Sequence, residues 1–182
     1  EGRSGIRPIE RFDVSAFETK FAGTVEGFDP TRWMEPKEAR RNDRFIQYAL
    51  AACEMAMVDA EYRVPPEDAE RVGVIVGAGL GGLETIERYA SVLEHRGPKK
   101  ISPFFIPSLI VNLAPGKISI RIGAKGPNWS PVSACATSGH AIGEGLEIIR
   151  RGAADAMIVG GAEATITPLG IGGFNAMKAL SV

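Results

Sequence analysis

One cysteine in this sequence stands where a thiol could act as a nucleophile. Cys135 lies between an extended segment, residues 127–132, and a helical pattern that begins at once and ends at Gly152. The N-terminus of a helix has unpaired N–H groups and the positive end of the helix dipole, and both stabilise a thiolate. The same N–H groups could serve as an oxyanion hole in acyl transfer. We interpret Cys135 as a candidate nucleophile, with a buried, inert cysteine as the alternative.

The helix that follows Cys135 is predicted to be buried on all sides. Apolar residues recur at Ile142, Leu146 and Ile149, and its first turns are mostly Ala, Ser and Gly. Each glycine disfavours a helix by about 1 kcal/mol, so this composition indicates close contact with neighbouring backbones. His140 lies five positions after Cys135, about 500° around the helix axis, so the two side chains diverge. We therefore expect His140 to be structural and find no base for Cys135.

A glycine-rich turn follows a predicted buried strand. Residues 71–76 form a β-branched run, and residues 77–82, Gly-Ala-Gly-Leu-Gly-Gly, lead into a helix predicted over 83–95. The motif matches the dinucleotide-binding pattern. That unit also needs a second strand and an acidic residue about 20 residues further on, and residues 98–104 supply neither. We favour a turn in which glycine allows close packing, and keep a nucleotide-binding α/β domain as a distant alternative.

The other elements predict a layered α/β fold. A helix begins at Pro36 and continues, with room for a break, to about Tyr62. Residues 154–159 form a second buried strand, and residues 167–174 indicate a loop before a helix near Asn175. Apolar strands that alternate with helices indicate a mostly parallel sheet.

Composition indicates a globular chain with a single core. The 182 residues carry a net charge of −1, which argues against a nucleic-acid partner, and no apolar run is long enough to span a membrane. Two separated cysteines offer no disulfide framework or metal cluster and are typical of a reducing compartment. Cys53 falls in an apolar helical run and is expected in the core. Residues 1–34 indicate an irregular surface segment anchored by aromatic side chains.

Several long motifs resemble the β-ketoacyl-acyl carrier protein synthase family. Residues 133–143 and 152–163 resemble its nucleophile region, and residues 101–108 and 167–174 resemble the type II elongation enzymes. The resemblance implies that residues 1–182 are the N-terminal part of one synthase domain, truncated at both ends. It also implies a thiolase-like layered α/β fold, a cytoplasmic homodimer, and no cofactor or metal.

The resemblance further implies a reaction. Cys135 would accept an acyl group from acyl carrier protein, with its own N–H in the oxyanion hole. Malonyl-acyl carrier protein would then lose carbon dioxide and attack the acyl-enzyme in a Claisen condensation, extending a fatty acyl chain by two carbons. Ile110 and Phe174 resemble positions that line the acyl pocket. The family's catalytic histidines and lysine lie outside these residues, so the 182 residues alone are expected to be inactive.

A basic face is the candidate docking site. Lys37, Arg40 and Arg41 are spaced to share one helix face, which on residue types alone indicates a solvated surface. Together with Lys125 they resemble the patch that docks the acidic acyl carrier protein, where charge complementarity steers encounter. Two alternatives stay open at this point, a polyketide-type ketosynthase and a non-catalytic partner subunit that sets chain length. A thiolase acting on coenzyme A thioesters is a nearer relative, which the type II motifs disfavour.

Overall fold

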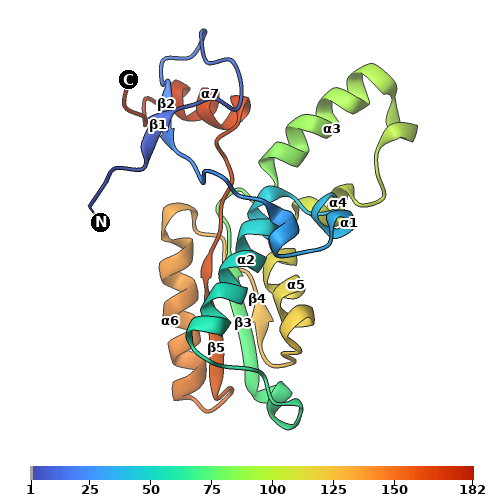
Figure 1. Ribbon diagram of the computed structural model, residues 1–182, viewed down its shortest axis with the longest axis vertical. Helices are drawn as coiled ribbons and strands as arrows, with labels where there is room; N and C mark the ends of the chain where they lie inside the picture. The colour runs from blue at the N-terminus through green and yellow to red at the C-terminus, as the bar shows by residue number, and fades with distance from the viewer. Residues whose placement is uncertain (1) are drawn as a thin grey trace.

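The computed structural model describes residues 2–182 and is organised around a three-stranded parallel sheet (Figure 1). The strands are ordered β4 (Asn128–Trp129), β3 (Val72–Gly77) and β5 (Ala156–Gly161). In the register of β3 and β5, Val72 lies opposite Ala156 and Gly77 opposite Gly161. The two strands therefore end at the same edge of the sheet, and the segments that follow them are neighbours.

Alternate residues of β3 face two different helical layers. Val72, Val74 and Val76 belong to a core shared with α2 (Arg44–Asp59) and α5 (Leu113–Ile122). Ile75 belongs to a second core with α6 (Thr137–Arg150) on the other side. Side chains alternate along a strand, so a continuous β-branched run can be covered on both faces. The predicted layered α/β fold with a parallel sheet is confirmed.

Shorter elements surround the sheet. They are the hairpin β1 (Ile6–Pro8) and β2 (Phe21–Gly23), the helices α1 (Pro36–Ala39), α3 (Leu83–Arg96), α4 (Phe105–Leu109) and α7 (Pro168–Ala176), and the 3-10 turns η1 (Pro30–Arg32), η2 (Pro66–Arg71), η3 (Pro98–Lys100) and η4 (Ala134–Ala136). Figure 1 shows α3 as an arm, with the hairpin and α7 at the same end of the molecule. Thr19 Oγ1 donates to the Ser181 carbonyl at 2.7 Å, which ties the hairpin to the C-terminal segment. No helix in the described part of the chain is long and apolar enough to cross a bilayer.

One helix departs from the sequence-based predictions, and one break within a predicted helix is located. Residues 167–174, expected as a loop, form most of α7, because Thr167 Oγ1 accepts from the Gly170 N–H at 3.1 Å and Pro168 occupies the first helical position. The glycines of this segment hid the helix, since their intrinsic propensity is low. The helix predicted to run from Pro36 is divided at the break for which the sequence left room: α1 ends at Ala39, and Asp43 caps α2.

The helix after the candidate nucleophile is buried on one face only. Its sheet side carries Thr137, Ala141, Gly145 and Ile148, and its outer side carries Ile142, Leu146 and Ile149. Ile142 is 56% exposed and Leu146 is 48% exposed. The expectation of burial on all sides is therefore wrong for residues 2–182. The sheet covers a single face of α6, and the apolar residues that gave the helical pattern point away from it.

Candidate active site

Cys135 lies in η4, a single turn between β4 and α6. The preceding residue, Ala134, has φ +50°, a left-handed conformation that is uncommon for a residue with a Cβ. Such strain costs about 1–3 kcal/mol and is concentrated at functional sites. Within this turn the Cys135 side chain is exposed. Its N–H belongs to the first turn of a helix, where no intrahelical acceptor precedes it.

Side-chain hydrogen bonds hold this turn in place. Thr137 is buried, and its Oγ1 accepts from the Ser133 N–H at 2.9 Å. His140 Nδ1 lies 2.6 Å from Ser133 Oγ. His140 therefore braces the turn, in keeping with its predicted structural role. A Cβ on Gly77 would overlap the Thr137 methyl group, so α6 packs directly on the end of β3.

A cavity of about 390 Å³ opens beside Cys135. Its lining comes from the turn after β3, the start of α6 and the end of β5 with α7, and comprises Gly77, Ala78, Gly79, Leu80, Ala134, Cys135, Thr137, Ser138, Gly161, Ala162, Glu163, Thr165 and Phe174. An apolar groove of about 280 Å³ adjoins it, shares Leu80 and Phe174, and continues along Leu83, Leu169 and Met177. An extended apolar group bound at Cys135 would have a continuous apolar wall to follow.

The structure brings one of the two predicted acyl-pocket residues to the cysteine. Phe174 lines the Cys135 cavity, whereas Ile110 is half-buried at the end of α4 and lines neither the cavity nor the groove. Leu80, which had no predicted role, lines both. The sequence held one indication of this role, because Leu80 is the one large side chain within the glycine-rich turn.

The glycine-rich turn packs closely against other parts of the chain. Gly82 N–H donates to the Leu109 carbonyl at 3.1 Å, and a Cβ on Gly82 would overlap Leu109. Gly81 has φ +71°, which favours glycine. The following segment at residues 98–100 is the turn η3 and not a second strand. These contacts favour the interpretation that the glycines allow close packing, rather than the alternative that they form a nucleotide-binding loop.

Comparison with known proteins identifies the family. The family model for the β-ketoacyl synthase N-terminal domain matches residues 1–182. The chain belongs to the β-ketoacyl synthase family. It is 50% identical over 181 residues to 3-oxoacyl-[acyl-carrier-protein] synthase 2 of Vibrio harveyi, covering 100% of this chain and 44% of the relative. It is 46% identical to the enzyme of the same name from Staphylococcus aureus, again over 100% of this chain and 45% of the relative. The domain thus spans less than half the length of these relatives.

Solved structures of ketosynthases share the fold. A β-ketoacyl synthase from Burkholderia phymatum has a TM-score of 0.84 at 28% identity, covering 99% of this chain and 44% of that one. The ishigamide ketosynthase/chain length factor has a TM-score of 0.86 at 30% identity, covering 99% and 45%. A type II PKS ketosynthase, solved with its acyl-carrier protein, has a TM-score of 0.77 at 26% identity, covering 86% and 45%.

The second cysteine of the β-ketoacyl synthase domain is a core residue, as predicted. Cys53 is 7% exposed in α2 and packs in the core that includes Val72 and Ile118. Desolvation raises the pKa of the Cys53 thiol, and the charge of Arg121 opposes this to a smaller extent. Burial therefore keeps Cys53 as the unreactive thiol.

The basic residues of the synthase domain fall into two places. Lys37 and Arg40 are exposed at α1, and the Arg41 guanidinium stacks 4.0 Å from the centre of the Phe104 ring. The Lys125 N–H donates to the Ala69 carbonyl at 2.7 Å, beside the start of β3. Asp43, two residues after Arg41, is held at the opposite end of β3. Its N–H donates to the Ser108 carbonyl in α4, and its carboxylate accepts from the Thr85 N–H in the first turn of α3. Lys125 thus stands apart from the other three.

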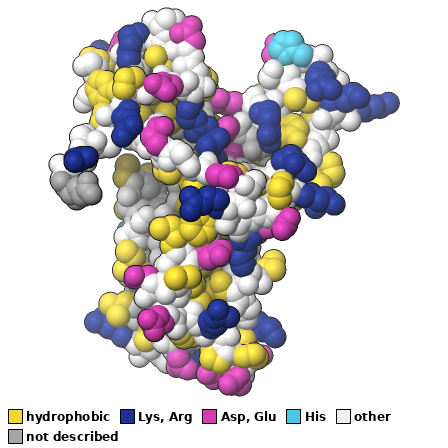
Figure 2. Space-filling model, in the orientation of Figure 1, with side chains coloured by type: hydrophobic (Ala, Val, Ile, Leu, Met, Phe, Trp, Pro, Cys, Tyr) yellow, Lys and Arg dark blue, Asp and Glu magenta, His cyan; other side chains and the backbone are white. Residues whose placement is uncertain are grey.

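Further cations extend the basic surface beyond the predicted set. Figure 2 shows Lys and Arg side chains gathered over the α3 arm and the adjoining region of α1 and α4. Arg96, Lys99 and Lys100 stand at the end of this arm.

Proposed function

We propose that the full-length synthase carries out the decarboxylative Claisen condensation of fatty acid elongation, with Cys135 as acyl acceptor. The observation that carries this is an exposed cysteine on a strained turn that opens into the cavity lined by Leu80 and Phe174. Relatives about 50% identical to this domain are named 3-oxoacyl-[acyl-carrier-protein] synthase 2. Both the nucleophile and the cavity wall belong to the present domain.

The chemistry divides between this domain and the rest of the protein. The Cys135 sulfur attacks the carbonyl carbon of a carrier-bound thioester, the carrier thiol leaves with a proton, and the N–H of Cys135 stabilises the oxyanion. Malonyl-acyl carrier protein then loses carbon dioxide, and its carbanion displaces the Cys135 sulfur to form the new carbon–carbon bond. The family resemblance assigns the histidines and lysine that assist decarboxylation to residues outside this chain.

Carrier docking is the second part of the proposal. The exposed cations Lys37 and Arg40, with Arg41, suit an acidic carrier protein, and one structural neighbour was solved with its acyl-carrier protein. Lys125 would contribute less because it lies beside the opposite end of β3. The family resemblance supports a homodimer in the cytoplasm as the working form.

Two observations favour fatty acid elongation over the alternatives. Identity to the elongation enzymes is 46–51%, against 26–30% for the polyketide ketosynthase and the ketosynthase/chain length factor. The nucleophile Cys135 is present, which a non-catalytic chain-length partner would lack.

Mass spectrometry tests the assignment directly. Full-length protein is incubated with an acyl-carrier thioester and digested, and the acyl mass should appear on the peptide that contains Cys135. An acyl mass on the Cys53 peptide, or on neither, would overturn the proposal.

A further inference from the structure

The glycine-rich turn after β3 is closed by a carboxylate. Leu80 N–H donates to Glu163 Oε2 at 2.8 Å, and Gly81 N–H donates to Glu163 Oε1 at 3.1 Å. Successive N–H groups in a turn that includes a left-handed residue form a concave nest for anions, and Gly81 has φ +71°. In this domain the nest binds a side chain of the same protein, two residues beyond the end of β5.

The sheet places this carboxylate opposite the turn. Gly77 and Gly161 are paired at the ends of β3 and β5, and the Ala162 N–H donates to the Gly77 carbonyl at 3.0 Å. A Cβ on Gly79 would lie 3.1 Å from Glu163 Oε2 and 3.7 Å from the Ala134 Cα. The glycine turn, the carboxylate and the backbone just before Cys135 therefore meet at one point.

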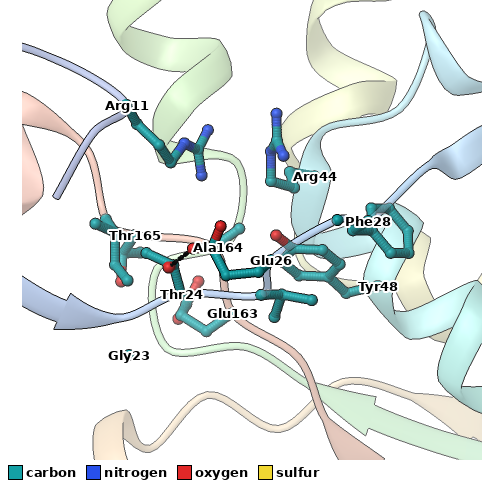
Figure 3. Close-up of a pocket in the computed structure, with 13 residues that line it drawn as sticks. Arg11, Gly23, Thr24, Glu26, Phe28, Arg44, Tyr48, Glu163, Ala164 and Thr165 are labelled. Carbon is teal, nitrogen blue, oxygen red and sulfur yellow. Dashed lines mark hydrogen bonds between the residues drawn. The ribbon is translucent and has the colours of Figure 1, made fainter. Parts of the chain in front are cut away.

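Glu163 also separates two cavities. It lines the Cys135 cavity and a second cavity of about 450 Å³, where Figure 3 shows it near Thr24 and Ala164, with Arg11 and Arg44 on the far side. Those two arginines pair with Glu84 instead, at 2.9 Å and 3.4 Å. The hydrogen bonds of the Glu163 carboxylate go to the glycine turn.

We propose that Glu163 is a positioning residue that fixes Leu80 in the wall of the Cys135 cavity. The inference rests on the proposed function, because it assigns the acyl chain to that cavity. The backbone of Leu80 is held by Glu163, while its side chain lines both the cavity and the apolar groove. Loss of the carboxylate would leave the Leu80 and Gly81 N–H groups without their acceptor, and Leu80 would no longer be held in the cavity wall. Long acyl chains, which reach past Leu80, should be affected more than the reaction at sulfur.

The test uses full-length protein with Glu163→Ala, Glu163→Gln and the matched control Glu67→Ala, an exposed glutamate in η2. Glu163→Ala should raise KM for a long-chain acyl carrier about fivefold, the size expected for losing a typical hydrogen bond. The change in KM for an acetyl carrier, and the change in the rate at which iodoacetamide alkylates Cys135, should both be smaller than this fivefold change. Glu163→Gln keeps one acceptor and should fall between, and Glu67→Ala should match wild type.

Hydrogen exchange provides a readout independent of activity. The amides of Leu80 and Gly81 should exchange faster in Glu163→Ala than in wild type. Unchanged exchange, unchanged long-chain KM, or equal losses with both carriers would each overturn the proposal. If wild-type protein is not acylated at Cys135, the proposed function fails instead, and the exchange measurement still tests the nest.

Discussion

The two cysteines of this domain show how position decides the behaviour of one residue type. Cys53 is 7% exposed within a long helix, and burial raises the pKa of its thiol. Cys135 is exposed on a short turn at the start of α6, beside a cavity. The first site is a buried position within a regular helix, whereas the second depends on a left-handed alanine. A strained backbone exposes the sulfur of Cys135, whereas the helix that holds Cys53 buries its sulfur.

The strongest test of this comparison removes each sulfur in the full-length protein. Cys135→Ala should abolish acylation and lower condensation by on the order of a thousandfold or more, as expected for loss of a nucleophile. Cys53→Ala should leave both nearly intact. Condensation is measured with acyl and malonyl carrier proteins, and thermal unfolding checks that both variants fold. Condensation that persists in Cys135→Ala would contradict the assignment.

The cavity wall should set the length of the acyl chain. Leu80→Phe fills space beside Cys135, and exclusion of two methylenes at about 0.8 kcal/mol each would disfavour the longest chain about fifteenfold. Ile110→Phe, at the other position that resembles the acyl-pocket lining, should have a smaller effect because Ile110 does not line this cavity. The measurement is the product-length profile. A larger shift for Ile110→Phe would place the acyl pocket elsewhere.

Charge reversal at α1 should affect the carrier and spare the chemistry. Arg40→Glu with Arg41→Glu should lower kcat/KM for a carrier-bound substrate about tenfold at low salt. Added salt should weaken the wild-type enzyme in the same assay. Arg40→Glu alone is the cleaner variant, since Arg41 also stacks on Phe104.

The controls for docking are a small substrate and a distant lysine. Activity on a pantetheine thioester should survive charge reversal, and Lys125→Glu should cost less than Arg40→Glu. Equal loss with carrier and pantetheine substrates would indicate a folding defect.

The smallest effect concerns stability at high pH. The folded state raises the Cys53 pKa above its ordinary 9.0, so above pH 9 the folded protein keeps a proton that the unfolded chain releases. The stability that the neutral thiol contributes is present below pH 9 and is lost as pH rises through the folded pKa. Urea unfolding of wild type and Cys53→Ala at pH 8 and pH 10 should show a stability difference that shrinks at the higher pH. A constant difference would mean that the pKa of Cys53 is the same in the folded and unfolded states.

Local patterns in the sequence predicted the central elements and singled out Cys135 as the candidate nucleophile. The β-branched run gave β3 within one residue of its observed bounds, and the periodic pattern after the glycines gave α3. Cys135 stood out because an extended segment meets a helix there. These features depend on neighbours in the chain, which is why periodicity and residue type sufficed.

Only the tertiary structure decided what surrounds Cys135. Leu80, Glu163 and Phe174 reach the Cys135 cavity from three separate segments, because β3 and β5 end at the same edge of the sheet. The same register puts the Glu163 carboxylate on the glycine turn that had matched a nucleotide-binding motif. Residue types and spacing can indicate a turn or a thiol, but pairing between distant strands decides which side chains meet, and that pairing has no local signature.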